Sequence, residues 1–162
     1  SAKHFEVLLE ETSKHGLTHY ETCSFGHPEY FSRHNTSYWL GKPYMGVGPS
    51  AHSFDGKSRS WNISNNTKYI KSLEANIRPF ESEILSLENR FNEYIMTGLR
   101  TIWGISLEKI ETDFGVVIKN KLLETSEKFR DSELLFLDEN HLKITKTGKF
   151  LSDGIASDLF LV

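Results

Sequence analysis

The first part of the chain alternates between a helical and a strand-like pattern of apolar positions. Four residues near the start recur at helical spacing: Phe5, Leu8, Leu9 and Thr12. Gly16 then supplies a typical helix stop, and residues 17–24 (LTHYETCS) show the period of two that favours a strand. This order of helix, turn and strand is that of an α/β repeat. Because one such unit cannot cover the edges and faces of its own strand, we expect further strands from outside this chain.

The next segments mix turn residues with strand-like runs. Residues 26–43 contain two glycines and two prolines and predict a loop. Residues 44–54 (YMGVGPSAHSF) predict a strand that carries small residues, and glycine inside a strand often marks the close approach of a ligand or another backbone. Residues 56–65 predict a turn and a short strand. Residues 65–76 predict a helix capped by Asn66 or Thr67.

The second half of the chain has a helical texture. A long amphipathic helix is expected from a cap at Ser82 to Gly104, with six residues on its apolar face: Ile84, Leu87, Phe91, Ile95, Leu99 and Ile102. A second helix between Ser106 and Gly115 and a third over residues 116–129 follow. Residues 132–145 predict a β-hairpin, and residues 146–161 a closing helix. This order of elements resembles a winged-helix domain. We therefore predict an α+β chain with two domains, residues 1–80 and 81–162, divided where Pro79 interrupts the pattern.

Charge and composition narrow the class of protein. Residues 1–80 carry nine Lys and Arg against seven Asp and Glu, whereas residues 81–162 carry ten against fifteen. The net charge of −3 gives no general attraction to nucleic acid, and no apolar run approaches the length of a membrane span. A single cysteine, Cys23, excludes an internal disulfide and an all-cysteine metal site within one chain. With no secretory signal pattern at the start, these features favour a cytoplasmic protein.

The densest candidate chemistry lies in residues 32–54. A histidine can bind haem iron through its imidazole, and flat aromatic side chains can line a porphyrin face, so one candidate set is His34, Asn35, Tyr38 and Trp39. From the local pattern alone we favour core packing, because one histidine without a defined partner set is weak support for a site. A second candidate set is Gly46, Gly48, Ala51 and His52, in which the glycines would let a ligand approach the backbone. Packing of small side chains explains this second set equally well.

Two further patterns favour structural roles. His19, Glu21 and Cys23 alternate along one predicted strand, which could suggest a metal site but is better explained by ordinary β alternation. If the second domain is a winged helix, residues 116–129 would hold its DNA-recognition helix. Acidic residues interrupt the lysines there, and the hairpin tip Asp-Glu-Asn is acidic, so we favour protein packing over DNA binding.

Residues 17–54 resemble the C-terminal half of the oxygen-independent coproporphyrinogen III oxidase-like proteins of the radical S-adenosylmethionine superfamily. The resemblance is to the haem chaperone branch, with its His-Asn-x-x-Tyr-Trp motif at residues 34–39 and its Gly-x-Gly-x-x-Ala-His segment at residues 46–52. It continues through residues 91–107 and 144–160. The chain departs from its relatives at Cys23 and Ser24, where Ile or Ser followed by Ser-Asn is common, and we assign Cys23 no role.

The resemblance implies a fragment: the last α/β units of a partial (β/α) barrel, followed by a small winged-helix-like domain. The intact parent would hold S-adenosylmethionine and a [4Fe-4S] cluster through a three-cysteine motif, which one cysteine cannot provide. The missing barrel portion would be a partner of this chain, and haem or another tetrapyrrole would be its ligand, with His34 as the first candidate iron ligand and His52 as the second. The implied function is that of a haem chaperone. Two alternatives remain, a coproporphyrinogen III oxidase that forms protoporphyrinogen IX and a winged-helix interaction module.

Overall fold

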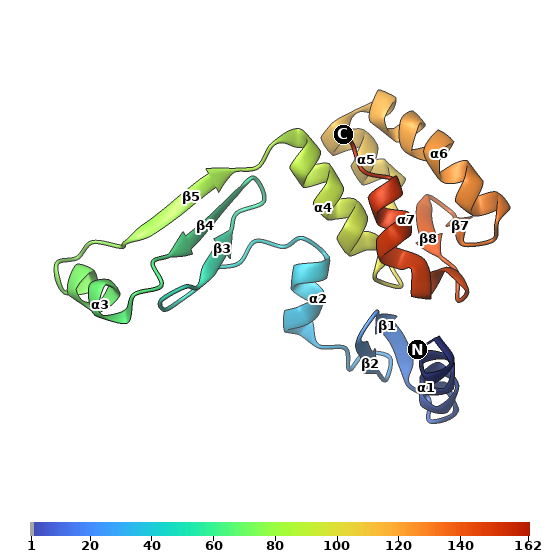
Figure 1. The fold of residues 1–162 in the computed structure, drawn as a ribbon, viewed down its shortest axis with the longest axis horizontal. Coiled ribbons are helices and arrows are strands. Elements are labelled where there is room, and N and C mark those ends of the chain that lie inside the picture. Colours follow the sequence, from blue (N-terminus) through green and yellow to red (C-terminus); the bar gives the residue numbers. More distant parts are fainter. Residues whose placement is uncertain (1) are drawn as a thin grey trace. The chain divides into compact units, whose positions relative to one another are not determined.

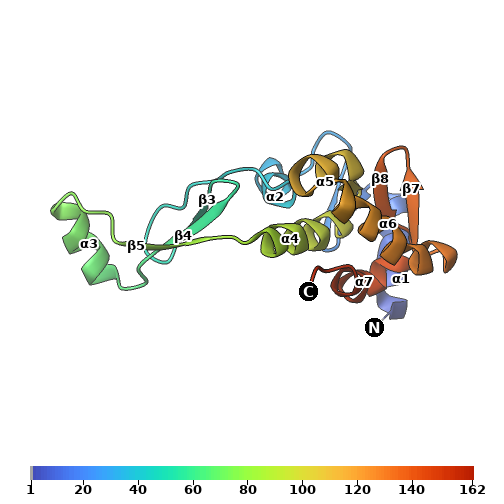
Figure 2. The same ribbon diagram turned by 90° about the horizontal axis from the view of Figure 1, so that it is seen from above.

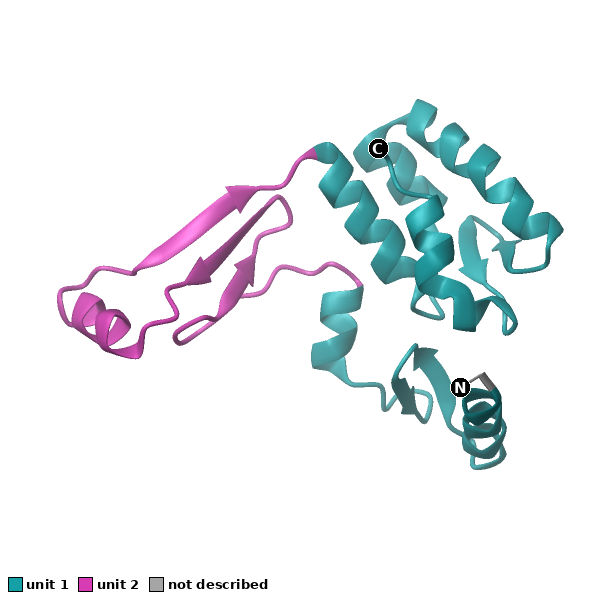
Figure 3. Ribbon diagram, viewed as in Figure 1, with its two compact units in different colours: residues 1–39, 87–162 teal, residues 40–86 magenta. Residues whose placement is uncertain are grey.

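The computed structural model describes residues 2–162 and divides the chain into two compact units (Figure 1, Figure 3). Unit 1 comprises residues 1–39 together with 87–162, and unit 2 comprises residues 40–86. Helices and strands alternate in both, so the predicted α+β class is confirmed. The units do not follow the predicted boundary between residues 80 and 81, and that boundary stays a prediction about the parent's domains. None of the helices within residues 2–162 has the length and apolar character needed to cross a membrane.

The start of unit 1 matches the predicted helix and strand only in part. The helix α1 (Ala2–Lys14) is followed by β1 (Thr18–Glu21), which pairs antiparallel with β2 (Ser24–Gly26). The predicted strand over residues 17–24 is therefore wrong in its second half. The carboxylate of Glu21 accepts hydrogen bonds from the Cys23 amide and the Ser24 hydroxyl, and this closes a turn where alternation predicts extended backbone.

The remainder of unit 1 confirms most of the predicted helical half. The elements in order are α4 (Leu87–Leu99), β6 (Ile105–Ser106), α5 (Leu107–Phe114), α6 (Val116–Asp131), β7 (Leu135–Asp138), β8 (His141–Ile144), the 3₁₀ helix η1 (Gly148–Leu151) and α7 (Ser152–Asp158). The three strands form an antiparallel sheet in the order β6-β8-β7. Ser106 caps α5 as predicted, since its hydroxyl accepts from the Lys109 amide at 3.2 Å. Gly115, with φ at 92°, separates α5 from α6.

These elements enclose the hydrophobic core of unit 1. The helix α7 packs against α4, and α6 packs against α5 (Figure 1, Figure 2). Phe91, Ile95 and Leu99 point inward from α4, each at most 1% exposed. The predicted apolar face of the long helix is thus confirmed in its central part. It is wrong at its start, because Ile84 lies in a strand and is 88% exposed, and at its end, because α4 stops at Leu99 and Ile102 is 36% exposed.

Unit 2 is a three-stranded antiparallel sheet with a helical connection. The strands β3 (His52–Phe54), β4 (Ser58–Asn62) and β5 (Phe80–Ile84) lie in sequence order, and α3 (Asn66–Glu74) joins β4 to β5. Asn65 caps α3 by accepting from the Lys68 amide at 2.9 Å, one residue before the predicted caps. The strand predicted over residues 44–54 is reduced to β3 and to an isolated bridge between Tyr44 and Phe54.

Little of unit 2 is buried. Among its described residues only Asn62 and Leu85 fall in the buried class, while large apolar side chains such as Met45, Val47 and Ile84 are 79%, 80% and 88% exposed. A sheet of this size normally covers one face with a second layer. Unit 2 therefore pairs its three strands but has few buried side chains of its own.

Candidate functional site

The predicted His-Asn-x-x-Tyr-Trp motif lies on a helix. Residues 33–39 form α2 (Arg33–Trp39), where the glycines and prolines around it had predicted a loop. Ser32 begins this helix, because its hydroxyl accepts from the Asn35 amide at 3.3 Å and its carbonyl from the Thr36 amide at 2.9 Å. The glycines and prolines lie on either side of the helix. The N-cap residue Ser32 was the signal that the loop prediction missed.

Helical spacing separates the motif into two faces. His34 and Tyr38, four residues apart, meet edge to face with their ring centroids 4.8 Å apart, and His34 and Asn35 are both exposed. Trp39 turns a different way, and its indole Nε1 is buried without a hydrogen-bond partner in the described chain. The motif thus offers an imidazole to solvent and an unused donor on its inner side.

A partly buried ion pair lies against the Trp39 ring. The guanidinium carbon of Arg100 lies 5.6 Å from the centroid of the Trp39 ring, and Arg100 Nη2 lies 3.4 Å from Oε1 of Glu21. Glu21 is 3% exposed, and its other carboxylate oxygen holds the turn between β1 and β2. Arg100 also reaches Asp153 on α7 at 3.2 Å. The arginine at the end of α4 therefore connects the motif helix to the strands and to the last helix.

The glycine segment belongs to unit 2, and at Gly46 the backbone of His52 occupies the space that a side chain would need, whereas the space beside Gly48 is open. A Cβ on Gly46 would lie 2.1 Å from the carbonyl oxygen of His52, so no other residue fits there. The Gly48 carbonyl accepts from the Asn62 side-chain amide at 2.8 Å and from the Ala51 amide at 3.3 Å. The small residues let this loop fold closely onto β4.

His52 is exposed on one face of the unit 2 sheet. It stands opposite Trp61 in the β3–β4 register, with ring centroids 6.0 Å apart. Trp61 Nε1 in turn donates to Glu81 Oε2 on β5 at 3.1 Å. His34 and His52 thus belong to different compact units.

The three residues considered as a metal site have separate structural partners. His19 Nε2 lies 3.1 Å from the Thr22 carbonyl oxygen, Glu21 pairs with Arg100, and Cys23 is exposed in the turn. No group of three or more metal-ligating side chains occurs within the described residues 2–162. These contacts support ordinary β alternation, and not a metal site, as the explanation for His19, Glu21 and Cys23.

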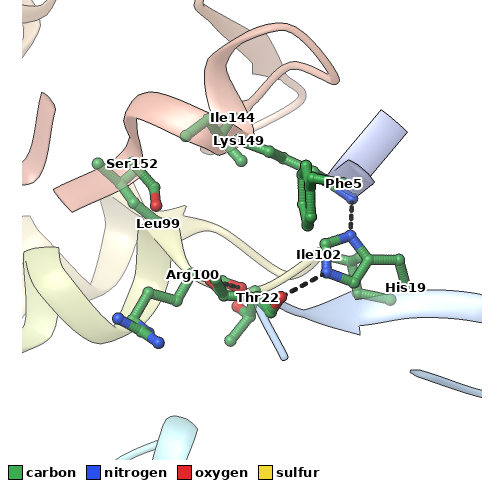
Figure 4. A pocket seen from close by; sticks show the side chains of 10 residues that line it. Phe5, His19, Thr22, Leu99, Arg100, Ile102, Ile144, Lys149 and Ser152 are labelled. Atoms are coloured by element: carbon green, nitrogen blue, oxygen red, sulfur yellow. Dashed lines mark hydrogen bonds between the residues drawn. The ribbon is translucent and has the colours of Figure 1, made fainter. Parts of the chain in front are cut away.

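Sequence reasoning did not identify a small cleft between His19 and Lys149 (Figure 4). The Lys149 ammonium on η1 lies 2.8 Å from His19 Nδ1, and the His19 ring stacks on Phe25 with a centroid separation of 4.6 Å. Because Lys149 can only donate and the Thr22 carbonyl can only accept, a neutral imidazole with its proton on Nε2 satisfies both contacts. The two residues are 130 positions apart in the sequence, so no local sequence pattern could predict the contact.

Burial controls the charge of this pair. Desolvation lowers the pKa of His19 below 6.5, opposed by the hydrogen bond to Thr22, and desolvation also lowers the pKa of Lys149, with a further contribution from Lys146. With about 10 Å³ of free volume the cleft admits a water molecule but not a tetrapyrrole. It is a structural junction between η1 and β1.

Comparisons with known proteins show what this chain is similar to. Residues 85–151 match the family model described as the HemN C-terminal domain. The chain is 27% identical to "Heme chaperone HemW" of Lactococcus lactis over 99% of this chain and 42% of the relative. It is 24% identical to "Heme chaperone HemW" of Bacillus subtilis over 95% of this chain and 41% of the relative. The chain thus spans about two fifths of the length of these curated relatives.

A solved structure shares the fold. The protein titled "Coproporphyrinogen III oxidase (HemN) from Escherichia coli is a Radical SAM enzyme" superposes with a TM-score of 0.70 over 96% of this chain and 40% of its own length, at 14% identity. At that identity the likeness is one of fold. Together with the sequence matches it agrees with the resemblance predicted from the motifs: the chain is similar to HemN-like proteins and, over nearly its whole length, to relatives named as haem chaperones.

Proposed function

We propose that this chain is the C-terminal part of a haem chaperone and that its α2 helix presents His34 as a ligand to haem iron. One observation carries the proposal: the motif residues lie on a helix that leaves the His34 imidazole exposed beside Tyr38. A neutral imidazole is a common axial ligand of haem iron, and an aromatic ring beside it can pack on a porphyrin edge. The HemW relatives, which match over nearly the whole chain, support the same assignment.

The motif also fits a tetrapyrrole in its polar chemistry. Trp39 Nε1 is a buried donor without an acceptor in the described chain, and Asn35 is an exposed amide at the start of the same helix. Bound haem would supply the iron that the imidazole coordinates. His34 would donate its nitrogen lone pair to that iron, Tyr38 and Asn35 would orient the macrocycle on the exposed side of α2, and Trp39 would shape the pocket from the inner side.

The finer architecture belongs to the same proposal. The pair α1–β1 would be an outer unit of a partial (β/α) barrel supplied mainly by the rest of the parent protein. The order α4, α5, α6, β7, β8, with β6 added to the hairpin, is consistent with a winged-helix-like domain. The sparse core of unit 2 agrees with packing against that missing portion.

The parent's other cofactors would be held elsewhere. A [4Fe-4S] cluster takes cysteine thiolates, and the single Cys23 does not fit that requirement. The cluster and most contacts to S-adenosylmethionine would therefore come from the parent's other residues. In this proposal Gly46, Gly48 and Ala51 turn their backbone toward the cofactor side, and His52 is the second candidate iron ligand.

A haem titration of the full-length parent tests the iron-ligand assignment. We expect His34→Ala to shift the Soret band and to weaken haem binding by about tenfold or more, because the iron loses an axial nitrogen. His15→Ala removes an exposed imidazole at the end of α1 and serves as the matched control. Unchanged spectra and affinity in His34→Ala would exclude His34 as the ligand. His52→Ala, titrated in parallel, tests the second candidate.

The oxidase alternative is supported by the fold similarity alone. It predicts anaerobic formation of protoporphyrinogen IX from coproporphyrinogen III by the full-length parent. Product formation at a rate that His34→Ala abolishes would favour the oxidase. Haem binding without product formation would favour the chaperone.

A further inference from the structure

The two faces of the unit 2 sheet differ in chemistry. The β3–β4–β5 register places His52, Trp61 and Glu81 in one row across the strands and Ser53, Ser60 and Ser82 in the next. Side chains of successive residues point to opposite faces, so the three serines share a face that the acidic and aromatic row does not. Asn62, which is 2% exposed, also belongs to this serine face.

The side chain of Arg78 lies against the serine face. Its Nε donates to Asn62 Oδ1 at 3.0 Å, and its Nη2 reaches Ser53 Oγ at 3.4 Å and Ser60 Oγ at 3.5 Å. Its guanidinium carbon sits 4.6 Å from the centroid of the Phe80 ring. A planar cation held by an amide, two hydroxyls and a ring face is fixed in orientation before any ligand arrives.

All of these partners are neutral. No ion pair joins Arg78 to a carboxylate within the described residues 2–162. Glu81 and Glu83 lie in the rows of the opposite face. Asp55, at the turn after β3, accepts hydrogen bonds from Ser58 and from the Lys57 amide. The serine face therefore carries one positive charge that these carboxylates do not neutralise.

The hydroxyl groups add donors rather than acceptors. Ser53 Oγ accepts from the Gly46 amide at 2.9 Å as well as from Arg78, and Ser60 Oγ accepts from Arg78. Neither hydroxyl donates its hydrogen to another described residue. Two O–H groups and the remaining edge of a guanidinium thus converge with no acceptor between them, and such a set of donors suits an oxyanion.

We propose that Arg78, Ser53 and Ser60 form a binding site for a carboxylate, and that in the parent protein this carboxylate is a propionate of the bound tetrapyrrole. The choice of a carboxylate follows from charge and donors, because one guanidinium matches one negative charge. Its Nε and Nη2 bond to Asn62, Ser53 and Ser60, so the Nη1 group and the two serine hydroxyls are the donors that would meet the carboxylate oxygens. The identification of the carboxylate with a propionate rests on the proposed haem-binding function. The existence of the anion site does not.

The first experiment uses esterified ligand. The full-length parent is titrated with haemin and with haemin dimethyl ester, in which both propionates are neutral. We expect the unmodified protein to prefer haemin by about tenfold, the size of one charge-assisted hydrogen-bonded pair, and Arg78→Gln to lose the preference. The control is Arg59→Gln, which changes an arginine on the opposite face, 3.9 Å from Glu83. This variant should keep the preference for haemin. An unchanged preference in Arg78→Gln would overturn the propionate assignment.

The second experiment needs no haem. Sodium propionate is titrated into the full-length protein while the side-chain Nε–H signal of Arg78 is followed by NMR. We expect a saturable shift with a dissociation constant on the order of millimolar, weakened by Ser60→Ala and absent from Arg78→Gln. A shift that does not saturate, or one that inorganic phosphate produces at much lower concentration, would overturn the carboxylate site. Saturable propionate binding in a protein that binds no haem would keep the site and reject the proposed function.

Discussion

The guanidinium of Arg100 lies over the Trp39 ring at 5.6 Å while one of its nitrogens pairs with Glu21 at 3.4 Å. Arg100 belongs to the turn after α4, inside the span that matches the HemN C-terminal domain, whereas Trp39 ends the helix that carries the candidate haem ligand. The Arg100 side chain therefore links the matched C-terminal segment to the helix α2. A cation over an aromatic face is stabilised most when it is withdrawn from water, as Arg100 is in part.

Glu21→Gln should destabilise unit 1. The change removes the buried partner of Arg100 and leaves it only the exposed Asp153, and breaking a buried pair in this way costs about 3 kcal/mol. The free energy of unfolding, measured by urea denaturation with tryptophan fluorescence, would report it. Asp153→Asn removes a partner that is 76% exposed and should cost less than about 1 kcal/mol, so equal losses in the two variants would contradict the prediction.

Gly46→Ala should disrupt the loop that precedes β3. The new Cβ would meet the His52 carbonyl, which belongs to the backbone and cannot rotate away. We expect a loss of several kcal/mol in stability and faster hydrogen exchange at the Asn62 amide, which bonds to the Ala51 carbonyl. Gly56→Ala is the control, because Gly56 has φ at 98° but open space around it, and its cost should stay near 1 kcal/mol, roughly the backbone term alone.

Trp39→Phe should separate stability from ligand binding. The substitution keeps an aromatic ring beneath Arg100 and removes the buried indole N–H that has no acceptor in the described chain. The fold loses no hydrogen bond, so we expect a change in unfolding free energy of only about 1 kcal/mol from lost packing. Haem affinity of the full-length parent should fall several-fold, because the ligand loses a donor. A large loss of stability with unchanged affinity would show that Trp39 serves the fold alone.

The stability of unit 1 should depend on the protonation of His19. Burial lowers the pKa of His19 in the folded protein below its value of 6.5, so the unfolded chain binds this proton more readily. Stability from the neutral ring is therefore present above pH 6.5 and is lost as the pH falls through the lowered folded pKa. Protonation would also place an imidazolium against the Lys149 ammonium.

Because the ring is only half-buried, the total loss should stay below about 1 kcal/mol. Urea denaturation at pH 7.5 and at pH 5.5 measures it. His19→Gln should remove this part of the pH dependence, whereas His15→Gln, at an exposed position just after α1, should retain it. Identical pH dependence in the unmodified protein and His19→Gln would reject the assignment.

Local patterns were sufficient where one element decides its own structure. The caps and glycines around α5, the hairpin turn at Asp138–Asn140 and the inward face of α4 depend on neighbours a few residues away, and all of them were predicted. The motif spacing from His34 to Trp39 likewise indicated the resemblance to the proteins that the comparisons later matched, because it needs only residue types in order. The loop prediction failed over α2, because the glycines and prolines that flank this helix do not determine the structure of the residues between them. The strand prediction failed at Cys23, because the alternating pattern continued through a turn.

Long-range contacts were decided by the tertiary structure alone. The pairing of Glu21 with Arg100 spans 79 residues and that of His19 with Lys149 spans 130, and neither residue type alone indicates its partner. The same is true of Arg78, whose three neutral partners come from two strands. Most helical segments and the family resemblance could be predicted from the sequence, since these follow from local sterics and spacing. Which charges are buried, paired or left available depends on how distant segments pack, and only the folded chain decided it.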